Sequence, residues 1–441
     1  MEPAGYPDIF LYLMLIIGLP LAFLKPYKAF LVVVFILSAA DATAFTFTRI
    51  PALGPYFNAN DACLLMAIVA MISYTLIVGN KIIFSKVVKL ILLVLFLGFA
   101  QSWFSIPGYH YEILRSLRWA ISMPLYFVIA ATMVNNKEKT RLLLLALFFG
   151  SIVSAFEHIL FVRNVINELS SDVGIEQIRT IAFRSPGLWL LLSSIVWMPK
   201  MKGLSRKILI IGGSLFALSV LLNQTRSIWI SSITAIPIAF ILFPQKKTIS
   251  RIVTFSLLLP VLFACMLAIM HYAAPSVNVE NIVEQRLTTF SDEDIRFDTT
   301  KTRQNAIEKE IEAWTEGTFV FGRGLVYFAP YYLDYYKGTR VAWGHVGHLS
   351  TLAQLGIIGF LVFAIYLPHK VIQASGVLWR GSSQELKFFG LLGGMCMVSS
   401  WVCFFMSDSF LGHHAVEGVI FGGVWAQARL SIVQEKGEKK D

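Results

Sequence analysis

Thirteen apolar runs, most of them close to twenty residues long, make up the greater part of this 441-residue sequence. A helix of about 20 residues spans the hydrocarbon core of a bilayer, and only helices or closed barrels satisfy their backbone groups in lipid. The runs do not alternate between apolar and polar residues as barrel strands do. The sequence therefore predicts an all-α, polytopic membrane helical bundle of about 12–13 spans. The runs cover residues 9–24, 28–46, 60–78, 84–103, 113–133, 139–162, 181–198, 206–222, 227–243, 251–271, 348–367, 386–407 and 411–432.

The composition fits a chain that lies mostly in lipid. Charged residues make up 15% of the sequence, whereas soluble domains carry about 25%. All four cysteines lie in the apolar runs and lack the spacing of a metal site or a disulfide framework. We interpret them as small packing residues; they are Cys63, Cys265, Cys396 and Cys403.

Basic residues gather on one side of the predicted membrane. Alternate connections carry 22 Lys and Arg against 5 acidic residues, and the other connections carry 15 against 22. The positive-inside rule places the basic side in the cytoplasm, which puts the N-terminus outside and the C-terminal tail inside. The net charge of +10 thus follows from topology, and we expect no nucleic-acid partner. The first run lacks a basic n-region, so we expect no cleaved signal peptide.

A polar segment at residues 272–347 interrupts the apolar runs on the outer side. It divides the membrane domain into N-terminal helices at 1–271, a large outer loop, and C-terminal helices with a cytoplasmic tail at 348–441. A loop of this size, running into a histidine at a membrane boundary, is where a membrane enzyme would keep its chemistry.

Three parts of the outer loop have recognisable patterns. Residues 300–314 place apolar side chains at helical spacing and predict an amphipathic helix. FGRGL, residues 321–325, predicts a turn. The aromatic-rich residues 327–336 either anchor the loop at the headgroup level or stack on sugar rings.

Two arginines begin predicted spans at the outer boundary. Arg184 lies in AFRSPGLWL and Arg226 in LNQTRSIWI, and Arg115 and Arg118 lie at the same level. Arginine donates paired hydrogen bonds to phosphate and stays charged, so such a cluster suits a diphosphate. The alternative is that these side chains reach toward lipid headgroups.

Histidines are the candidate bases. His345 and His348 flank the start of a span, and a neutral imidazole can accept a proton from a sugar hydroxyl near neutral pH. Either could instead cap the helix. The sequence Asp292-Glu293-Asp294 contains an Asp-x-Asp pair, a type that holds a metal ion in many sugar transferases, but a solvated loop is the favoured interpretation. We expect neither a metal nor a cofactor.

One spacing is more specific than these single residues. His345 is followed eleven residues later by Gly356, and then by Gly359 at the head of the next span. This pattern resembles the O-antigen ligase/O-antigen polymerase superfamily of bacterial polysaccharide assembly. Val346 departs from the Asn, Ser or Gln that the family commonly has there. His348 to Gly359 has the same spacing, but the segment as a whole fits His345 better.

Further elements follow in the family's order, and the similarity covers roughly residues 180–365. They are Arg184-Ser-Pro-Gly187 at the start of a span, Thr225-Arg226-Ser227 after a short outer turn, and Arg303, Trp314 and Gly322-Arg-Gly324 in the outer loop.

The resemblance implies an inverting, metal-independent glycosyl transfer at the periplasmic face of the bacterial inner membrane. The donor would be a glycan on undecaprenyl diphosphate, and the acceptor a lipid A–core hydroxyl in a ligase or another lipid-linked glycan in a polymerase. Arg184 and Arg226 would hold the diphosphate and His345 would be the catalytic base. Candidates for a supporting role are Arg303, His348 and Arg118.

Two other classes compete with this interpretation. A flippase or transporter of lipid-linked oligosaccharides would place charged residues near the bilayer midplane, whereas these arginines gather at one face. A non-catalytic assembly protein with this fold would not need the histidine and both arginines.

Overall fold

The computed structural model describes residues 16–39, 58–105, 110–168, 187–197, 203–222, 226–244, 299–325, 347–381, 383–405 and 414–438, with the single positions 264 and 268. These ranges are mainly helical and contain no strand, and Thr318 and Gly322 form an isolated bridge. The all-α prediction is confirmed. The helices are α2 (Pro26–Ala39), α4 (Ala59–Val78), α5 (Lys86–Ser105), α6 (His110–Met133), α7 (Lys137–Glu168), α9 (Gly187–Trp197), α10 (Gly203–Leu222), α11 (Arg226–Leu242), α14 (Thr299–Glu316), α16 (Gly347–Phe360), the π-helical turn η3 (Leu361–Tyr366), α17 (Leu367–Arg380), α18 (Gln384–Cys403) and α19 (Ala415–Glu438).

Seven helical stretches among the described residues are long and apolar enough to cross a membrane, and three shorter apolar helices accompany them. The prediction of a multi-pass membrane protein is therefore confirmed. The beginning of the run at 9–24 and nearly all of the run at 251–271 fall outside the described residues, so the total of about 12–13 spans stays a prediction. Large apolar side chains such as Phe96 and Phe104 of α5 lie on the outside of the bundle, as expected where lipid is the solvent.

One predicted boundary is wrong. The helical stretch that contains the run at 348–367 continues through α16, η3 and α17 and ends only at Arg380, with one break at Gly356. Residues 368–380 are too polar to be recognised as part of a span, but Val371, Ala374 and Leu378 share a buried face. That face packs against α18, so tertiary contact keeps this polar segment helical.

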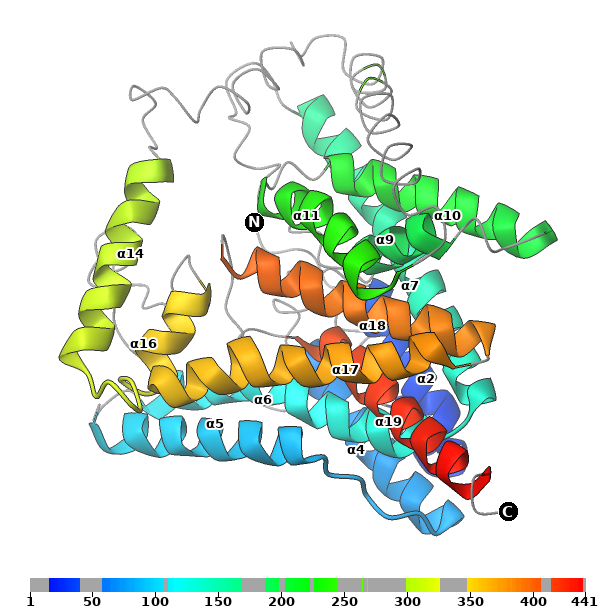
Figure 1. Ribbon diagram of the computed structural model, residues 1–441, viewed down its shortest axis with the longest axis horizontal. Helices are drawn as coiled ribbons and strands as arrows, with labels where there is room; N and C mark the ends of the chain where they lie inside the picture. The colour runs from blue at the N-terminus through cyan, green and yellow to red at the C-terminus, as the bar shows by residue number, and fades with distance from the viewer. Residues whose placement is uncertain are drawn as a thin grey trace.

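The helices form layers (Figure 1). α4, α5 and α6 lie on one side, α17, α18 and α19 in the middle, and α9, α10 and α11 beyond α18. α14 stands apart at one end of the bundle, beside α16.

Among the described helices, α6 and α19 make the most extensive contact. Gly418 and Gly422 of α19 face backbone carbonyls of α6, and a Cβ at either glycine would overlap the carbonyl of Met123 or Phe127. The spacing Gly-x-x-x-Gly lets two helix backbones approach closely in a membrane. This contact holds the second half of α6 against α19.

Candidate functional site

The predicted amphipathic helix of the outer loop exists as α14, Thr299–Glu316. Its buried face differs from the apolar face in the sequence pattern. Glu310 and Ala313 are buried, whereas Ile311 is 42% exposed. Ser350 of α16 donates a hydrogen bond of 2.9 Å to Glu310 Oε1. α14 therefore packs on α16 partly through a carboxylate, and Ile311 lies outside the buried face.

The turn predicted at residues 321–325 follows α14. It docks into a break in α16. Gly356 has φ +64°, which interrupts the helix. In an unbroken helix the carbonyls of Ala353 and Gln354 would accept from the N–H groups of Ile357 and Ile358. The break frees all four of these backbone groups, and each then needs another partner.

Backbone groups of the turn supply those partners. Arg323 N and Gly324 N donate to the freed carbonyls of residues 353 and 354, both at 2.8 Å. The carbonyls of Phe319 and Val320 accept from the N–H groups of residues 357 and 358, at 3.2 and 3.3 Å. Leu325 N also donates to the carbonyl of Gly98 in α5, at 3.2 Å. We call this contact of residues 318–325 with residues 353–358 and Gly98 the α16 junction.

Side-chain amides complete the α16 junction. Gln101 of α5 donates to the carbonyl of Gly322 at 2.6 Å, and Gln354 donates to the carbonyl of Leu325 at 2.9 Å. The junction thus joins the outer loop to two helices that the sequence separates widely.

Glycine is required where the two backbones meet. A Cβ on Gly322 would lie 2.6 Å from Gly356 N, and a Cβ on Gly356 would overlap the carbonyl of Val320. Gly324 has φ +97° and faces Ser102 of α5. Positive φ values are costly for residues with a side chain. Backbone geometry and close packing therefore explain why these three positions of the family pattern are glycines, without any contact with a substrate.

His348, the alternative family histidine, is buried at the start of α16. Its Nε2 lies 3.0 Å from the carbonyl of Trp401, and its ring lies 4.1 Å from that of Phe405. Its backbone N–H donates to the carbonyl of Phe404 at 3.3 Å. These contacts tie α16 to the end of α18, which is a packing role.

The other predicted site residues are described only in part. Arg184 and His345 lie outside the described residues, as do Asp292, Asp294 and residues 327–336. Arg226 is the first residue of α11 and Arg303 lies in the first turns of α14, but their side chains are also outside the description. Their assembly into one site stays a prediction.

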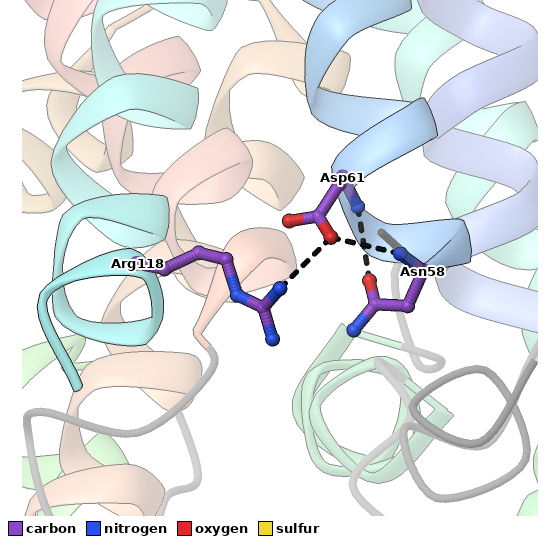
Figure 2. Close-up of polar contacts among 3 residues, drawn as sticks. All are labelled: Asn58, Asp61 and Arg118. Carbon is purple, nitrogen blue, oxygen red and sulfur yellow. Dashed lines mark hydrogen bonds and ion pairs between the residues drawn. The ribbon is translucent and has the colours of Figure 1, made fainter. Parts of the chain in front are cut away.

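Arg118 pairs with an acidic residue that the sequence analysis did not single out. Its Nη1 lies 3.0 Å from Oδ2 of Asp61, and the two side chains are 30% and 16% exposed (Figure 2). Asp61 also takes part in a capping box at the start of α4. Its Oδ2 accepts from Asn58 N at 2.9 Å, and its N–H donates to Asn58 Oδ1 at 3.1 Å.

The capping box was detectable in the sequence, because Asn-x-x-Asp directly precedes an apolar run. The partner Arg118 lies 57 positions away, and no local pattern predicts that pairing. The pairing matters for the supporting role expected of Arg118, since a guanidinium beside a carboxylate attracts a diphosphate less than a lone one does.

Within the described part of the chain, no three His, Cys, Asp or Glu side chains gather as metal ligands would. Metal independence stays a prediction.

Residues 211–364 match the family described as O-antigen ligase. The matched segment contains Arg226, α14, the position of His345 and the α16 junction apart from its contacts with α5, whereas Arg184 and the Asp61–Arg118 pair precede it. No curated protein matches the sequence.

Proposed function

Because residues 211–364 form an O-antigen ligase family domain in a multi-pass membrane protein, we propose that the protein is a membrane glycosyltransferase. It moves a glycan from undecaprenyl diphosphate to an acceptor hydroxyl, as on lipid A–core. The reaction takes place at the periplasmic face of the bacterial inner membrane, the side that carries the fewer basic residues.

The proposed reaction is a single displacement. The acceptor oxygen attacks the anomeric carbon from the side opposite the diphosphate, the bond from that carbon to the phosphate oxygen breaks, and undecaprenyl diphosphate leaves. His345 accepts the proton of the acceptor hydroxyl. Arg184 and Arg226 stabilise the charge that develops on the leaving diphosphate, which removes the need for a metal ion.

The α16 junction is the observation that carries this proposal. It ties the outer loop to the helix that begins two residues after His345, and it does so with glycines of the family pattern. A catalytic group works only when its support is rigid. The junction supplies such support in the helix that follows the proposed base in the sequence.

Three substitutions test the assignment: His345→Ala, Arg184→Ala and Arg226→Ala. Loss of the base should lower transfer about 10²–10⁴-fold, and loss of either arginine about 10²–10³-fold. The measurement is transfer of a radiolabelled lipid-linked glycan by purified protein in lipid vesicles. Full activity in all three variants at equal folded amounts would reject the assignment.

His348→Gln is the matched control for His345→Ala. The amide of glutamine can replace the contact of Nε2 with the carbonyl of Trp401, so the main expected effect is a lower melting temperature. Transfer per folded molecule should fall far less than in His345→Ala. The reverse order would make His348 the family histidine.

The same assay separates the remaining candidates. A ligase transfers the glycan to lipid A–core oligosaccharide, whereas a polymerase produces longer lipid-linked chains when a second lipid-linked repeat is the acceptor. A flippase changes the side on which the lipid lies and makes no new glycosidic bond. A protein that only moves the lipid would contradict the proposal.

A further inference from the structure

The turn of the α16 junction carries three exposed apolar side chains in a row. Phe319, Val320 and Phe321 are 55%, 41% and 45% exposed, and we call these three residues the junction tip. The carbonyls of the first two bond to α16, while the side chains of all three lie at the surface. Contiguous apolar side chains at a surface mark a site with an apolar partner.

The apolar surface of the junction tip continues along one flank of α14. The indole N–H of Trp314 donates to the carbonyl of Phe319 at 3.2 Å, and the rings of these two residues lie 4.7 Å apart. Ile311, which is 42% exposed, precedes Trp314 by about one turn and shares its flank. A different face of α14 carries an exposed acidic stripe at helical spacing. The stripe consists of Glu308, Glu312 and Glu316.

The junction contacts α5 well before the end of that span. Leu325 N donates to the carbonyl of Gly98, and a Cβ on Gly324 would overlap Ser102. The 20 residues of α5 are enough to cross the hydrocarbon core, and Gly98 lies about 10 Å before the end of the helix along its axis. Trp103, a residue type that favours the membrane interface, lies between Gly98 and that end. The contact is therefore at a depth inside the hydrocarbon.

The orientation of α14 agrees with this depth. In Figure 1, α14 lies crosswise to α5 and α17 at one end of the bundle, and its last turn is the end that lies near α5 and α16. A helix that lies in the plane of the membrane surface has this direction relative to the spans. The turn that follows α14 then faces the edge of the bilayer core.

The backbone of the turn meets the condition that lipid imposes. Irregular backbone at membrane depth is tolerated only where the protein itself satisfies its polar groups. The N–H groups of residues 322–325 all donate to carbonyls, and the carbonyls of residues 318–320, 322 and 325 all accept. In water the solvent could take the place of many of these partners. Such complete bonding fits a segment that lies in lipid.

Two charged residues flank the junction tip in the sequence. Glu316 precedes it and Arg323 follows it, and their side chains pair with each other at the surface. Long charged side chains at a membrane boundary reach toward the headgroups. The pair therefore suits the headgroup level, with the apolar tip on the hydrocarbon side of it.

We propose that the junction tip inserts into the membrane leaflet at this end of α5, with acyl chains of the bilayer as its partner. The charge distribution predicts that this is the outer leaflet. Phe96 and Phe104 of α5, which are 63% and 83% exposed, belong to the same lipid-facing surface. The outer loop is thus anchored in lipid at the point where its backbone bonds to α16. Insertion requires no glycosyl transfer, so it stands or falls independently of the proposed function.

The accessibility of a nitroxide measures the surroundings of the tip. The spin label is attached to Phe321→Cys in the full-length protein, which is placed in vesicles of phosphatidylethanolamine and phosphatidylglycerol without donor lipid. Power-saturation EPR compares collisions with oxygen, which dissolves in hydrocarbon, and with a nickel chelate, which stays in water. The ratio of oxygen to nickel collisions should approach that of Phe96→Cys in α5. It should clearly exceed that of Glu312→Cys on the acidic stripe.

The parent protein, taken through the same labelling, gives the background from the native cysteines. A melting temperature equal to that of the parent protein shows that the labelled variant is folded, and Phe319→Cys replaces Phe321→Cys if it is not. A ratio as low as that of Glu312→Cys would place the tip in water and overturn the proposal. Protection from both reagents would also overturn it, because protein, such as a second copy of this chain, would then cover the tip.

Discussion

The α16 junction and the Asp61–Arg118 pair both join distant parts of the chain, but they use different atoms. Five backbone hydrogen bonds and two side-chain amides hold the junction, and three of its positions must lack a side chain. Between α4 and α6, side chains make the contact, through the ion pair of Asp61 with Arg118. The backbone contact requires one geometry, whereas the chemistry of a side-chain contact changes with a single substitution.

This difference separates support from recognition. A backbone contact carries no information about a ligand but holds two segments in a fixed register. A lining of side chains can match a particular ligand, since each group offers its own donors and acceptors. We expect an added side chain at the junction to cost more stability than the loss of one charge from the Asp61–Arg118 pair.

The largest effect is expected for Gly356→Ala. The new Cβ would overlap the carbonyl of Val320, and the residue would have to keep φ +64°, so the loss of stability should be at least about 3 kcal/mol. The measurement is thermal unfolding in detergent.

Gly376→Ala is the matched control, because a Cβ at this α17 position meets nothing within 4 Å. It should leave stability unchanged or raise it by up to about 1 kcal/mol. Equal behaviour of the two alanine variants would contradict the structural account of the junction.

An intermediate effect is expected at the Asp61–Arg118 pair. Asp61→Asn leaves Arg118 without its counter-charge and weakens the cap at the start of α4, which should cost about 1–2 kcal/mol. A double-mutant cycle with Arg118→Met should give a coupling energy of about 1 kcal/mol, since the pair is partly exposed. Additive effects would show that the ion pair contributes nothing to stability.

The smallest effect is expected for Arg323→Ala, between two glycines of the junction. The backbone N–H of Arg323 bonds to Ala353, while its side chain pairs with Glu316 at the surface. An exposed pair of this kind contributes about 0–1 kcal/mol. A change in melting temperature as large as that of Gly356→Ala would show that the junction depends on this side chain.

The sequence was sufficient for elements that the bilayer itself constrains. The apolar runs at 60–78 and 113–133 match the spans Ala59–Val78 and Ile113–Met133, because the thickness of the hydrocarbon core sets their length. The turn at 321–325 was also predictable, since its glycines admit positive φ.

Long-range contacts were not predictable from local patterns. The spacing of Gly356 in the family pattern gave no indication that it faces Gly322, because no periodicity relates residues in different segments. The buried face of α14 was also missed: its apolar residues suggested one face, but apolar side chains can face lipid while Glu310 turns toward protein. The polar α17 needed α18 to remain helical.

The outward-facing side chains of the junction offer a place to attach a reporter. Phe321 is 45% exposed, and its neighbours are held through their backbones. A fluorophore on a cysteine at this position would leave the hydrogen bonds intact while travelling with the outer loop. Its signal would register undocking of the loop from α16 during turnover, which makes the timing of that event accessible in a single labelled molecule.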